Sequence, residues 1–424
     1  MNKVVTNRGK ESRILAMIMA GGKGERLYPL TCERTKPAVP FGGKYRIIDF
    51  VLSNFINSGI YSIYVLAQFK CQSLIQHLQD GWRFGGLLHD HFITPVPAQM
   101  RRGKEWYLGT ADAIHQNINL VEKFDGEIIA VFGADHVYRM DIRQMADFHL
   151  RKKGHATVSV LSVPISEAKH FGVIAVDETM RIIGFEEKPK HPTPMPKNKD
   201  LALVSMGNYL FNKDFLIDIL KHDAAHGHEG AHDFGKDILP RIHKQYPIYA
   251  YDFKKNRVPG VNKTEEVGYW RDVGTIGAYW EANMDLRNIT PNFDLYNHLW
   301  PLKTSSYSYP PAKLGFDSSG RKGMAINSLV SDGSAILGGK VQDSIIGRNV
   351  LIKGDAAVIN SIIMDNVVIG EGCKINMAII DKGTVIPDGT IIGYDLSNDR
   401  KKYFVDEDSR IIVVSNKLHT EETA

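Results

Sequence analysis

Aliphatic residues near the carboxyl end of this 424-residue chain recur at a regular spacing, and this constrains the fold more than any other sequence feature. They form triplets with internal steps of six residues, and each triplet joins the next by a step of five. The positions are Leu329, Ala335, Val341, Ile346, Ile352, Val358, Ile363, Ile369, Ile375, Ile380, Ile386 and Ile392. This spacing predicts a four-turn coil with three flat faces, whose inward side chains stack turn upon turn. The alternative, a β-sandwich, spaces its strands less regularly.

The part of the chain before residue 290 has a different pattern, in which short apolar runs alternate with helical periodicity. The runs that predict strands lie at residues 14–20, 60–67, 127–134, 157–163, 203–211 and 248–253, and residues 174–176 and 182–185 predict a hairpin. One helix, opened by Thr110 and Asp112, is expected where apolar residues between Ile114 and Phe124 share a face. Such alternation is typical of a Rossmann-like α/β domain with a mixed, mostly parallel sheet.

The two patterns divide the chain into three parts. We expect an α/β domain at residues 11–290, a connector at 291–327 and the coil domain at 328–424. The connector is assigned because residues 301–312 are rich in proline and serine.

Composition excludes several classes of protein. Hydrophobic residues make up 43% of the chain and charged residues 24%, as in a water-soluble globular protein. A formal net charge of +4 is too small for a dedicated nucleic-acid binder. No apolar run approaches the length of a membrane helix, and the run at 14–20 leads into glycines where a secretion signal would have its cleavage site. The three cysteines, Cys32, Cys71 and Cys373, have no paired spacing, so a reducing cytoplasm is expected.

A glycine-rich loop, Gly21-Gly22-Lys23-Gly24-Glu25-Arg26, follows the first predicted strand. Glycines let the backbone approach a phosphate closely, and the two cations add positive charge. The loop has neither the GxxxxGK[ST] nor the GxGxxG spacing, so neither a P-loop ATPase nor a dinucleotide-binding dehydrogenase is supported. A simple strand-to-helix turn remains the alternative for the loop taken alone.

Asp135 follows an apolar strand and is therefore expected at the carboxyl edge of the sheet, where open α/β folds bind their ligands. Asp272 stands in a loop before a helical segment. Two carboxylates that converge on a triphosphate would hold Mg²⁺. A single aspartate at a strand end is otherwise a common turn or helix-cap residue.

The motifs along the chain resemble those of the bacterial glucose-1-phosphate adenylyltransferases, also called ADP-glucose pyrophosphorylases. The matching residues after the glycine loop are Lys36-Pro37-Ala38, Phe41-Gly42-Gly43-Lys44, Trp106-Tyr107, Gly109-Thr110-Ala111-Asp112-Ala113, Glu187-Lys188-Pro189, Ser205-Met206-Gly207, His232-Asp233-Phe234-Gly235-Lys236-Asp237 and Tyr269-Trp270-Arg271-Asp272-Val273-Gly274-Thr275. The resemblance covers nearly the whole chain. It implies a nucleotidyltransferase domain followed by a left-handed parallel β-helix of hexapeptide repeats.

The resemblance also implies an activity and a set of site residues. The expected reaction converts ATP and α-D-glucose 1-phosphate to ADP-glucose and diphosphate, a step of bacterial glycogen synthesis. By resemblance, Asp135 and Asp272 are the Mg²⁺ ligands. The expected triphosphate-binding residues are Arg26 and Lys36, together with the backbone of Gly21, Gly22 and Gly24. The expected glucose 1-phosphate contacts are Tyr107, Gly172, Glu187, Lys188 and Ser205.

Regulation by anionic effectors and a homotetrameric assembly are further implications of the resemblance, with Arg34 and Arg46 matching basic effector-site positions. Glu33 stands where some members have an activator-binding lysine, and Pro40 replaces a histidine, so the identity of the activator stays open. Ala134 replaces the glycine that commonly precedes the first metal-binding aspartate.

Two alternatives remain. The first is a sister pyrophosphorylase that uses UTP or dTTP, because the glycine loop and Lys188 serve that wider superfamily. The second is a regulatory subunit that has the same fold but does not turn over substrate. A metal site at the histidine-rich segment His222, His226, His228 and His232 is not expected, because no second cluster completes a ligand set.

Overall fold

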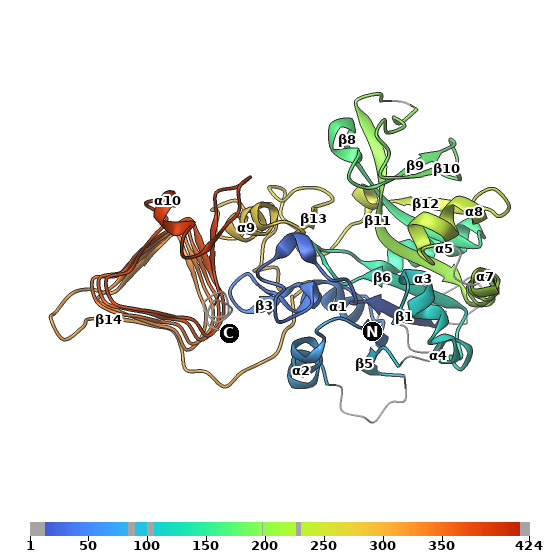
Figure 1. The fold of residues 1–424 in the computed structure, drawn as a ribbon. Coiled ribbons are helices and arrows are strands. Elements are labelled where there is room, and N and C mark those ends of the chain that lie inside the picture. The colour runs from blue at the N-terminus through green and yellow to red at the C-terminus, as the bar shows by residue number, and fades with distance from the viewer. Residues whose placement is uncertain (1–12, 84–89, 100–105, 197, 226–229, 416–424) are drawn as a thin grey trace.

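The computed structural model describes residues 13–83, 90–99, 106–196, 198–225 and 230–415. An amino-terminal α/β domain and a carboxyl-terminal coil of triangular cross-section lie side by side (Figure 1). The sequence predicts both architectures. Helix α9 (Ile276–Asp285) lies near the edge of the coil (Figure 1).

The α/β domain is built on a nine-stranded mixed sheet. Its strands are β1 (Ile14–Met19), β4 (Ser62–Ala67), β5 (Phe92–Pro97), β6 (Ile128–Gly133), β8 (Ala156–Pro164), β9 (Gly172–Val176), β10 (Ile182–Glu187), β11 (Leu201–Asn212) and β12 (Ile248–Asp252). The main order is β10-β9-β11-β6-β1-β4-β5. Strands β6, β1, β4 and β5 are parallel, whereas β11 runs antiparallel to β6, β8 and β9.

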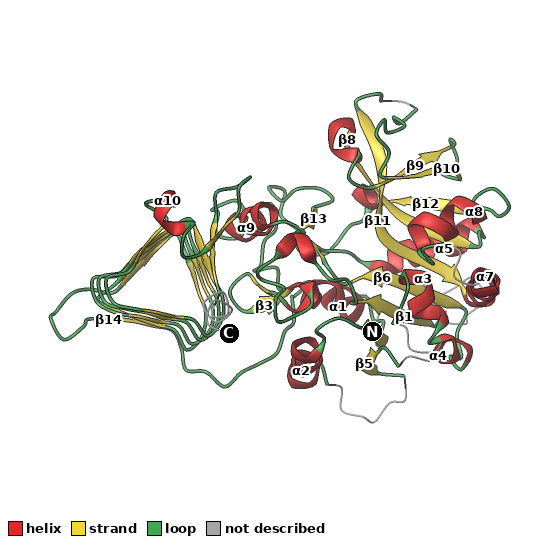
Figure 2. Cartoon of the chain, in the orientation of Figure 1, coloured by secondary structure: helices red, strands yellow, loops and turns green. Residues whose placement is uncertain are grey.

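Strand β1 lies in the interior of the sheet, between β6 and β4, and helices cover both faces (Figure 2). Ala16 and Ile18 point into one apolar core, while Leu15 and Met17 point into a second core on the opposite face. Alternate side chains of β1 thus pack into apolar cores on opposite faces of the sheet, which is why the strand is a continuous apolar run.

Strand β5, at the edge of the sheet, is not predicted from the sequence. It contains Pro95 and Pro97, which cannot donate a backbone hydrogen bond. An edge strand tolerates them because one of its sides has no partner strand.

The helices of the structure are α1 (Ile47–Asn57), α2 (Gln72–Gly81), α3 (Thr110–His115), α4 (Ile118–Glu122), α5 (Ile142–Lys152), α6 (Ile165–Ala168), α7 (Lys213–Ala225), α8 (Leu239–Ile242), α9 and α10 (Leu396–Asp399). The single helix expected after Thr110 is therefore two short helices. Asn117 interrupts it, because its side-chain amide donates to the carbonyl of Ala113 and its backbone has left the helical region.

The carboxyl-terminal coil consists of three sheets that form the sides of a prism (Figures 1 and 2). The first contains β14 (Lys313–Gly315), β17 (Ala335–Leu337), β20 (Leu351–Ile352), β23 (Val368–Ile369) and β26 (Val385–Ile386). The second contains β15 (Met324–Ile326), β18 (Lys340–Gln342), β21 (Ala357–Ile359), β24 (Lys374–Asn376) and β27 (Ile391–Ile392). The third contains β16 (Leu329–Val330), β19 (Ile345–Ile346), β22 (Ile362–Ile363), β25 (Ala378–Ile380), β29 (Ile412–Val414) and β28 (Phe404–Val405).

Ten of the twelve predicted inward positions are confirmed as buried, and the first two are wrong. Val330 pairs with Ile346, and Ile336 pairs with Ile352, so Val330 and Ile336 hold the inward positions instead of Leu329 and Ala335. The steps from Val330 to Ile346 and from Ile336 to Ile352 are 16 residues, whereas the next steps, from Ile346 to Ile363 and from Ile352 to Ile369, are 17, and this difference shifts the phase of the repeat. The coil also begins earlier than expected, because β14 and β15 lie within residues 291–327.

A third apolar core joins the two domains. Phe41 and Tyr279 of the α/β domain pack in one cluster with Ile379 and Val413 of the coil. Beside it, the buried Arg34 side chain forms an ion pair with Asp381 of the coil. No helix among the described residues is long and apolar enough to span a membrane.

Candidate active site

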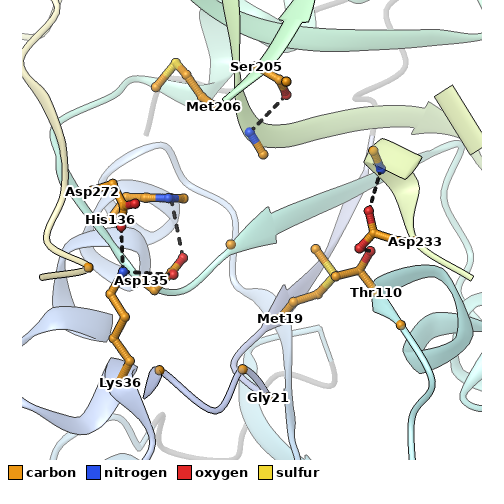
Figure 3. A pocket seen from close by; sticks show the side chains of 18 of the residues that line it. Met19, Gly21, Lys36, Thr110, Asp135, His136, Ser205, Met206, Asp233 and Asp272 are labelled. Carbon is orange, nitrogen blue, oxygen red and sulfur yellow. Dashed lines mark hydrogen bonds and ion pairs between the residues drawn. The ribbon is translucent and has the colours of Figure 1, made fainter. Parts of the chain in front are cut away.

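A cavity of about 930 Å³ opens at the carboxyl ends of β1 and β6 (Figure 3). Its lining includes Gly21, Gly22, Gly24, Arg26, Lys36, Tyr107, Asp135, Gly172, Glu187, Lys188, Ser205 and Asp272. The structure therefore brings together every residue that the sequence analysis assigns to the nucleotide, the metal or the sugar phosphate. This position at the carboxyl edge of the sheet is where open α/β folds bind ligands.

The glycine loop crosses one end of the cavity. Gly24 has a φ of +66°, and a Cβ atom built there would lie 3.1 Å from both Lys36 Cβ and Thr31 Cγ2. Glycine adopts this conformation without strain, and a Cβ there would crowd the side chain of Lys36. At Gly22, by contrast, a Cβ would meet nothing within 4 Å. Gly24 therefore shapes the loop, while Gly22 leaves the backbone open to the cavity.

Lys36 lies between the two predicted metal-binding aspartates (Figure 3). Its Nζ is 3.1 Å from Asp135 Oδ2 and 2.7 Å from Asp272 Oδ1, and its side chain is only 7% exposed. A largely buried ammonium is stable there because both carboxylates neutralise it. Arg26 reaches the same group from solvent, with one guanidinium nitrogen 3.5 Å from Asp272 Oδ2.

The charges of this cluster stabilise one another. Burial alone would lower the pKa of Lys36, but the carboxylates of Asp135 and Asp272 outweigh it and raise that pKa above its ordinary value. Burial would raise the pKa of both aspartates, but the electrostatic interactions with the neighbouring His136 and Lys36 side chains outweigh it and hold each pKa below its ordinary value. Both carboxylates are therefore ionised at neutral pH.

A small two-stranded ladder explains how residues so far apart in sequence meet. Strand β7 (His136–Tyr138) runs antiparallel to β13 (Trp270–Asp272), and His136 pairs directly with Asp272. Asp135 immediately precedes β7. Sequence reasoning missed His136, although its position next to Asp135 was a signal for it.

The donor set fits a divalent cation. Asp135, His136 and Asp272 each offer one ligand atom, and these atoms lie within 4.8 Å of one another. Ionised carboxylates are the ligands that hard divalent cations prefer. The ammonium of Lys36 already binds one oxygen of each aspartate, which shows that the two carboxylates attract a positive charge to this place.

The opposite end of the cavity carries the Glu187-Lys188 pair. Gly172 lies directly across from Glu187 in the β9–β10 hairpin, and a Cβ at Gly172 would lie 2.8 Å from Phe185 Cζ and 3.0 Å from Glu187 Oε2. Burial raises the pKa of Glu187, which the charge of Lys188 only partly offsets. The Lys188 Nζ lies 3.9 Å from Glu187 Oε1, and its side chain is largely exposed to the cavity.

Ser205 and Tyr107 complete the predicted sugar-phosphate group. Ser205 lies at an irregularity in the pairing of β11 with β8, where its Oγ accepts a hydrogen bond from the backbone of Gly207. The backbone N–H of Tyr107 donates to Gln68 Oε1 at 2.7 Å, and its hydroxyl accepts from Asn117.

Two further residues in the cavity, Thr110 and Asp233, are not assigned to the nucleotide, the metal or the sugar phosphate in the sequence analysis. Thr110 Oγ1 donates to Asp233 Oδ2 at 2.8 Å, and Asp233 Oδ1 accepts from the backbone N–H of Gly235 (Figure 3). Thr110 opens a helix as expected, since it is the first residue of α3, but its hydroxyl bonds Asp233 and does not cap the helix. The motif His232 to Asp237 was the available signal for Asp233.

Arg34 and Arg46 lie outside this cavity. Both terminal nitrogens of the Arg34 guanidinium bond the Asp381 carboxylate, at 2.8 and 3.0 Å. Arg46 donates to the backbone carbonyl and the hydroxyl of Ser73, both at 2.8 Å. Both arginines therefore hold protein groups near the contact between the domains.

Ala134 is buried with a φ outside the left-handed region, so replacing glycine there introduces no backbone strain. Of the four clustered histidines, His222 lies in α7, and His232 bonds Asp223 Oδ2 at 2.7 Å. His226 and His228 lie outside the described residues.

Comparisons with known proteins agree with this architecture. Residues 15–289 match the nucleotidyl transferase family, and residues 310–414 match the GlmU-like C-terminal hexapeptide family. A glucose-1-phosphate adenylyltransferase of Aliivibrio fischeri (strain MJ11) is 51% identical over 94% of this chain and 97% of its own. Enzymes of the same name from Anaeromyxobacter sp. (strain Fw109-5) and Thermus thermophilus are each 50% identical, over 97% and 95% of this chain and 100% and 97% of their own lengths. The chain belongs to the glucose-1-phosphate adenylyltransferase family.

Proposed function

We propose that this protein transfers the adenylyl group of ATP to α-D-glucose 1-phosphate, forming ADP-glucose and diphosphate. One observation carries the proposal: a single cavity contains the glycine loop, the Lys36–Asp135–Asp272 cluster and the Glu187-Lys188 pair. The first two suit a triphosphate, and the third suits a phosphate attached to a sugar. The names and near full-length similarity of the relatives support this reaction over other nucleotidyl transfers.

The reaction requires no covalent nucleophile from the protein. An oxygen of the sugar phosphate attacks the α-phosphorus of ATP, the bond from that phosphorus to the bridging oxygen breaks, and diphosphate leaves on the opposite side. Because negative charge shifts onto phosphate oxygens, positioning and electrostatics supply most of the catalysis. We assign Arg26 and Lys36 to the triphosphate, with the backbone of Gly21, Gly22 and Gly24.

Asp135 and Asp272 would hold Mg²⁺. When bound, this ion would neutralise charge on the triphosphate and on the departing diphosphate. The proposal is supported by the low pKa of both carboxylates, which keeps them ionised and able to bind a cation without first losing a proton.

At the other end of the cavity, we assign Lys188 to the phosphate of glucose 1-phosphate and Glu187 to sugar hydroxyls. Tyr107 and Ser205 would contact the sugar, and Gly172 would leave space beside Glu187. An exposed lysine next to a carboxylate has freedom to turn toward a phosphate, which binds an ammonium strongly.

Regulation belongs to the same proposal. We propose that anionic effectors act near Arg34 and Arg46, that the protein works as a homotetramer, and that it supplies bacterial glycogen synthesis in the cytoplasm. The contact between the domains supports the proposed effector site. Arg34 forms an ion pair with Asp381 of the coil, and Arg46 interacts electrostatically with Asp365 of the coil.

Identification of the products tests the reaction. The purified full-length protein is incubated with ATP, glucose 1-phosphate and Mg²⁺, and the products are separated and identified by mass spectrometry. Equal amounts of ADP-glucose and diphosphate are expected. Formation of ADP and phosphate would contradict the proposal, and absence of all turnover would favour the regulatory-subunit alternative.

A further inference from the structure

His136 lies within the candidate metal cluster but has no assigned role in the proposed reaction. Two features of the fold fix its place: it directly follows Asp135, and it is the residue opposite Asp272 in the β7–β13 ladder. Directly opposed residues on antiparallel strands have neighbouring side chains. The imidazole is therefore held beside both carboxylates (Figure 3).

The ring of His136 has a defined orientation. It packs against the indole of Trp270, with ring centroids 4.8 Å apart and planes inclined by 40°. Its side chain is 15% exposed. Packing on one face and the ladder on the other side thus restrict the positions that its two nitrogens can take.

The Nδ1 atom of His136 is buried and has no hydrogen-bond partner among the described residues. Its separation from Asp135 Oδ1 is 3.6 Å, which is too long for a hydrogen bond. Leaving a buried polar atom unsatisfied is unfavourable, and such atoms commonly mark a place where an ion or water binds. A neutral imidazole nitrogen is also a common metal ligand.

Lys36 does not block this nitrogen. Its ammonium pairs with Asp135 Oδ2 and with Asp272 Oδ1. The other oxygen of Asp135, Oδ1, is the one that faces His136 Nδ1. One carboxylate oxygen therefore contacts the lysine while the second faces the imidazole.

We infer that His136 is a third protein ligand of the divalent cation, which it contacts through Nδ1 beside the carboxylates of Asp135 and Asp272. This inference rests on the proposed function for the presence of the cation, and it adds a nitrogen to a site expected to consist of oxygens. Mg²⁺ gains little from an imidazole, whereas Mn²⁺ and Co²⁺ bind nitrogen readily. His136 would therefore strengthen the binding of Mn²⁺ and Co²⁺ more than the binding of Mg²⁺.

Pulsed electron paramagnetic resonance of bound Mn²⁺ tests the contact without relying on activity. The full-length protein is loaded with Mn²⁺ and the unreactive analogue α,β-methylene-ATP. A nitrogen hyperfine coupling typical of coordinated imidazole is expected in the wild type and is expected to be absent in His136→Gln. His170→Gln is the matched control, because His170 lines the same cavity but is not part of the metal cluster, and it should keep the coupling.

Metal affinities provide a second readout. Loss of the nitrogen ligand in His136→Gln should weaken Mn²⁺ binding about tenfold or more and weaken Mg²⁺ binding much less. If the wild type binds Mn²⁺ without nitrogen coupling, or if the coupling survives in His136→Gln, the inference is wrong while the proposed reaction stands. A wild type that makes ADP-glucose but binds no Mn²⁺ also overturns it, whereas a failure of the proposed reaction would appear separately in the product assay.

His136→Asn is a second variant in case the glutamine variant folds poorly. Its thermal unfolding midpoint is compared with that of the wild type. The wild-type spectrum and the His170→Gln control do not depend on the folding of either His136 variant, so they decide whether an imidazole other than that of His170 coordinates the metal.

Discussion

The guanidinium of Arg34 forms two hydrogen bonds with the carboxylate of Asp381, at 2.8 and 3.0 Å, and so ties the α/β domain to the coil. Both side chains are almost completely buried, with 3% and 8% of their surfaces exposed. A pair of this kind is costly to break, because removing one partner leaves the other as an uncompensated charge.

Arg34→Met should therefore lower the free energy of unfolding by about 3–5 kcal/mol, measured by urea denaturation. Arg400→Met is the control, since Arg400 pairs with Glu407 on the exposed surface of the coil domain and should change stability far less than Arg34→Met. Equal effects of the two substitutions would show that the Arg34–Asp381 pair does not hold the domains together.

Asp135→Asn should leave the protein folded and reduce turnover by a factor of about 100 or more, because an amide cannot replace the charge that faces Lys36 and a bound cation. Initial rates of diphosphate release measure the loss, and circular dichroism checks the fold. Turnover close to that of the wild type would remove Asp135 from the catalytic group.

Lys188→Gln should raise KM for glucose 1-phosphate about tenfold or more and change kcat less, as expected when a ground-state contact with the phosphate is lost. Lys190→Gln is the matched control, because Lys190 is exposed two residues away and does not line the cavity. If both substitutions change KM alike, general surface charge and not a specific contact attracts the sugar phosphate.

The stability contributed by Asp272 should depend on pH. Its pKa is lower in the folded protein than in the unfolded chain, so its contribution is present above the unfolded value of about 3.9 and is lost as the pH falls through the folded value. The difference in unfolding free energy between the wild type and Asp272→Asn should be constant from about pH 6 to 8 and shrink below about pH 4. Urea denaturation across this range measures it, and a difference that grows in acid would contradict the assignment.

Lys36 should show the opposite trend. Its pKa is raised in the folded state, so its contribution is complete below the unfolded value of about 10.4 and is lost only as the pH rises through the higher folded value. The wild type should therefore keep this contribution throughout the neutral range.

The coil could be predicted closely because its physics is local and periodic. Each inward residue meets its equivalent one turn later, so a regular spacing is sufficient to reveal it. The prediction failed where the period itself changes: the steps from Val330 to Ile346 and from Ile336 to Ile352 are one residue short of the predicted period, so Val330 and Ile336 take the inward places. Strand β5 was missed for a related reason, since Pro95 and Pro97 obscure a strand that only its edge position permits.

The composition of the site was less accessible to sequence reasoning. Asp135 could be placed at a sheet edge, because it follows a buried strand, but its approach to Asp272 depends on the β7–β13 ladder, which joins distant segments. Resemblance to a family supplied that pairing. Neither the spacing of apolar residues nor the sequence motifs indicated that Lys36 bridges the two aspartates, because this contact depends on how distant segments pack in three dimensions.

The most direct test of the account compares nucleotides in one assay. Release of diphosphate from glucose 1-phosphate is measured with Mg²⁺ and, in parallel, with ATP, UTP, dTTP, CTP and GTP. The account predicts that kcat/KM for ATP exceeds that for every other nucleotide by about 100-fold or more, as a site with specific base contacts allows. A preference for UTP or dTTP would leave the fold and the charged cluster intact but would contradict adenylyl transfer as the function of this protein.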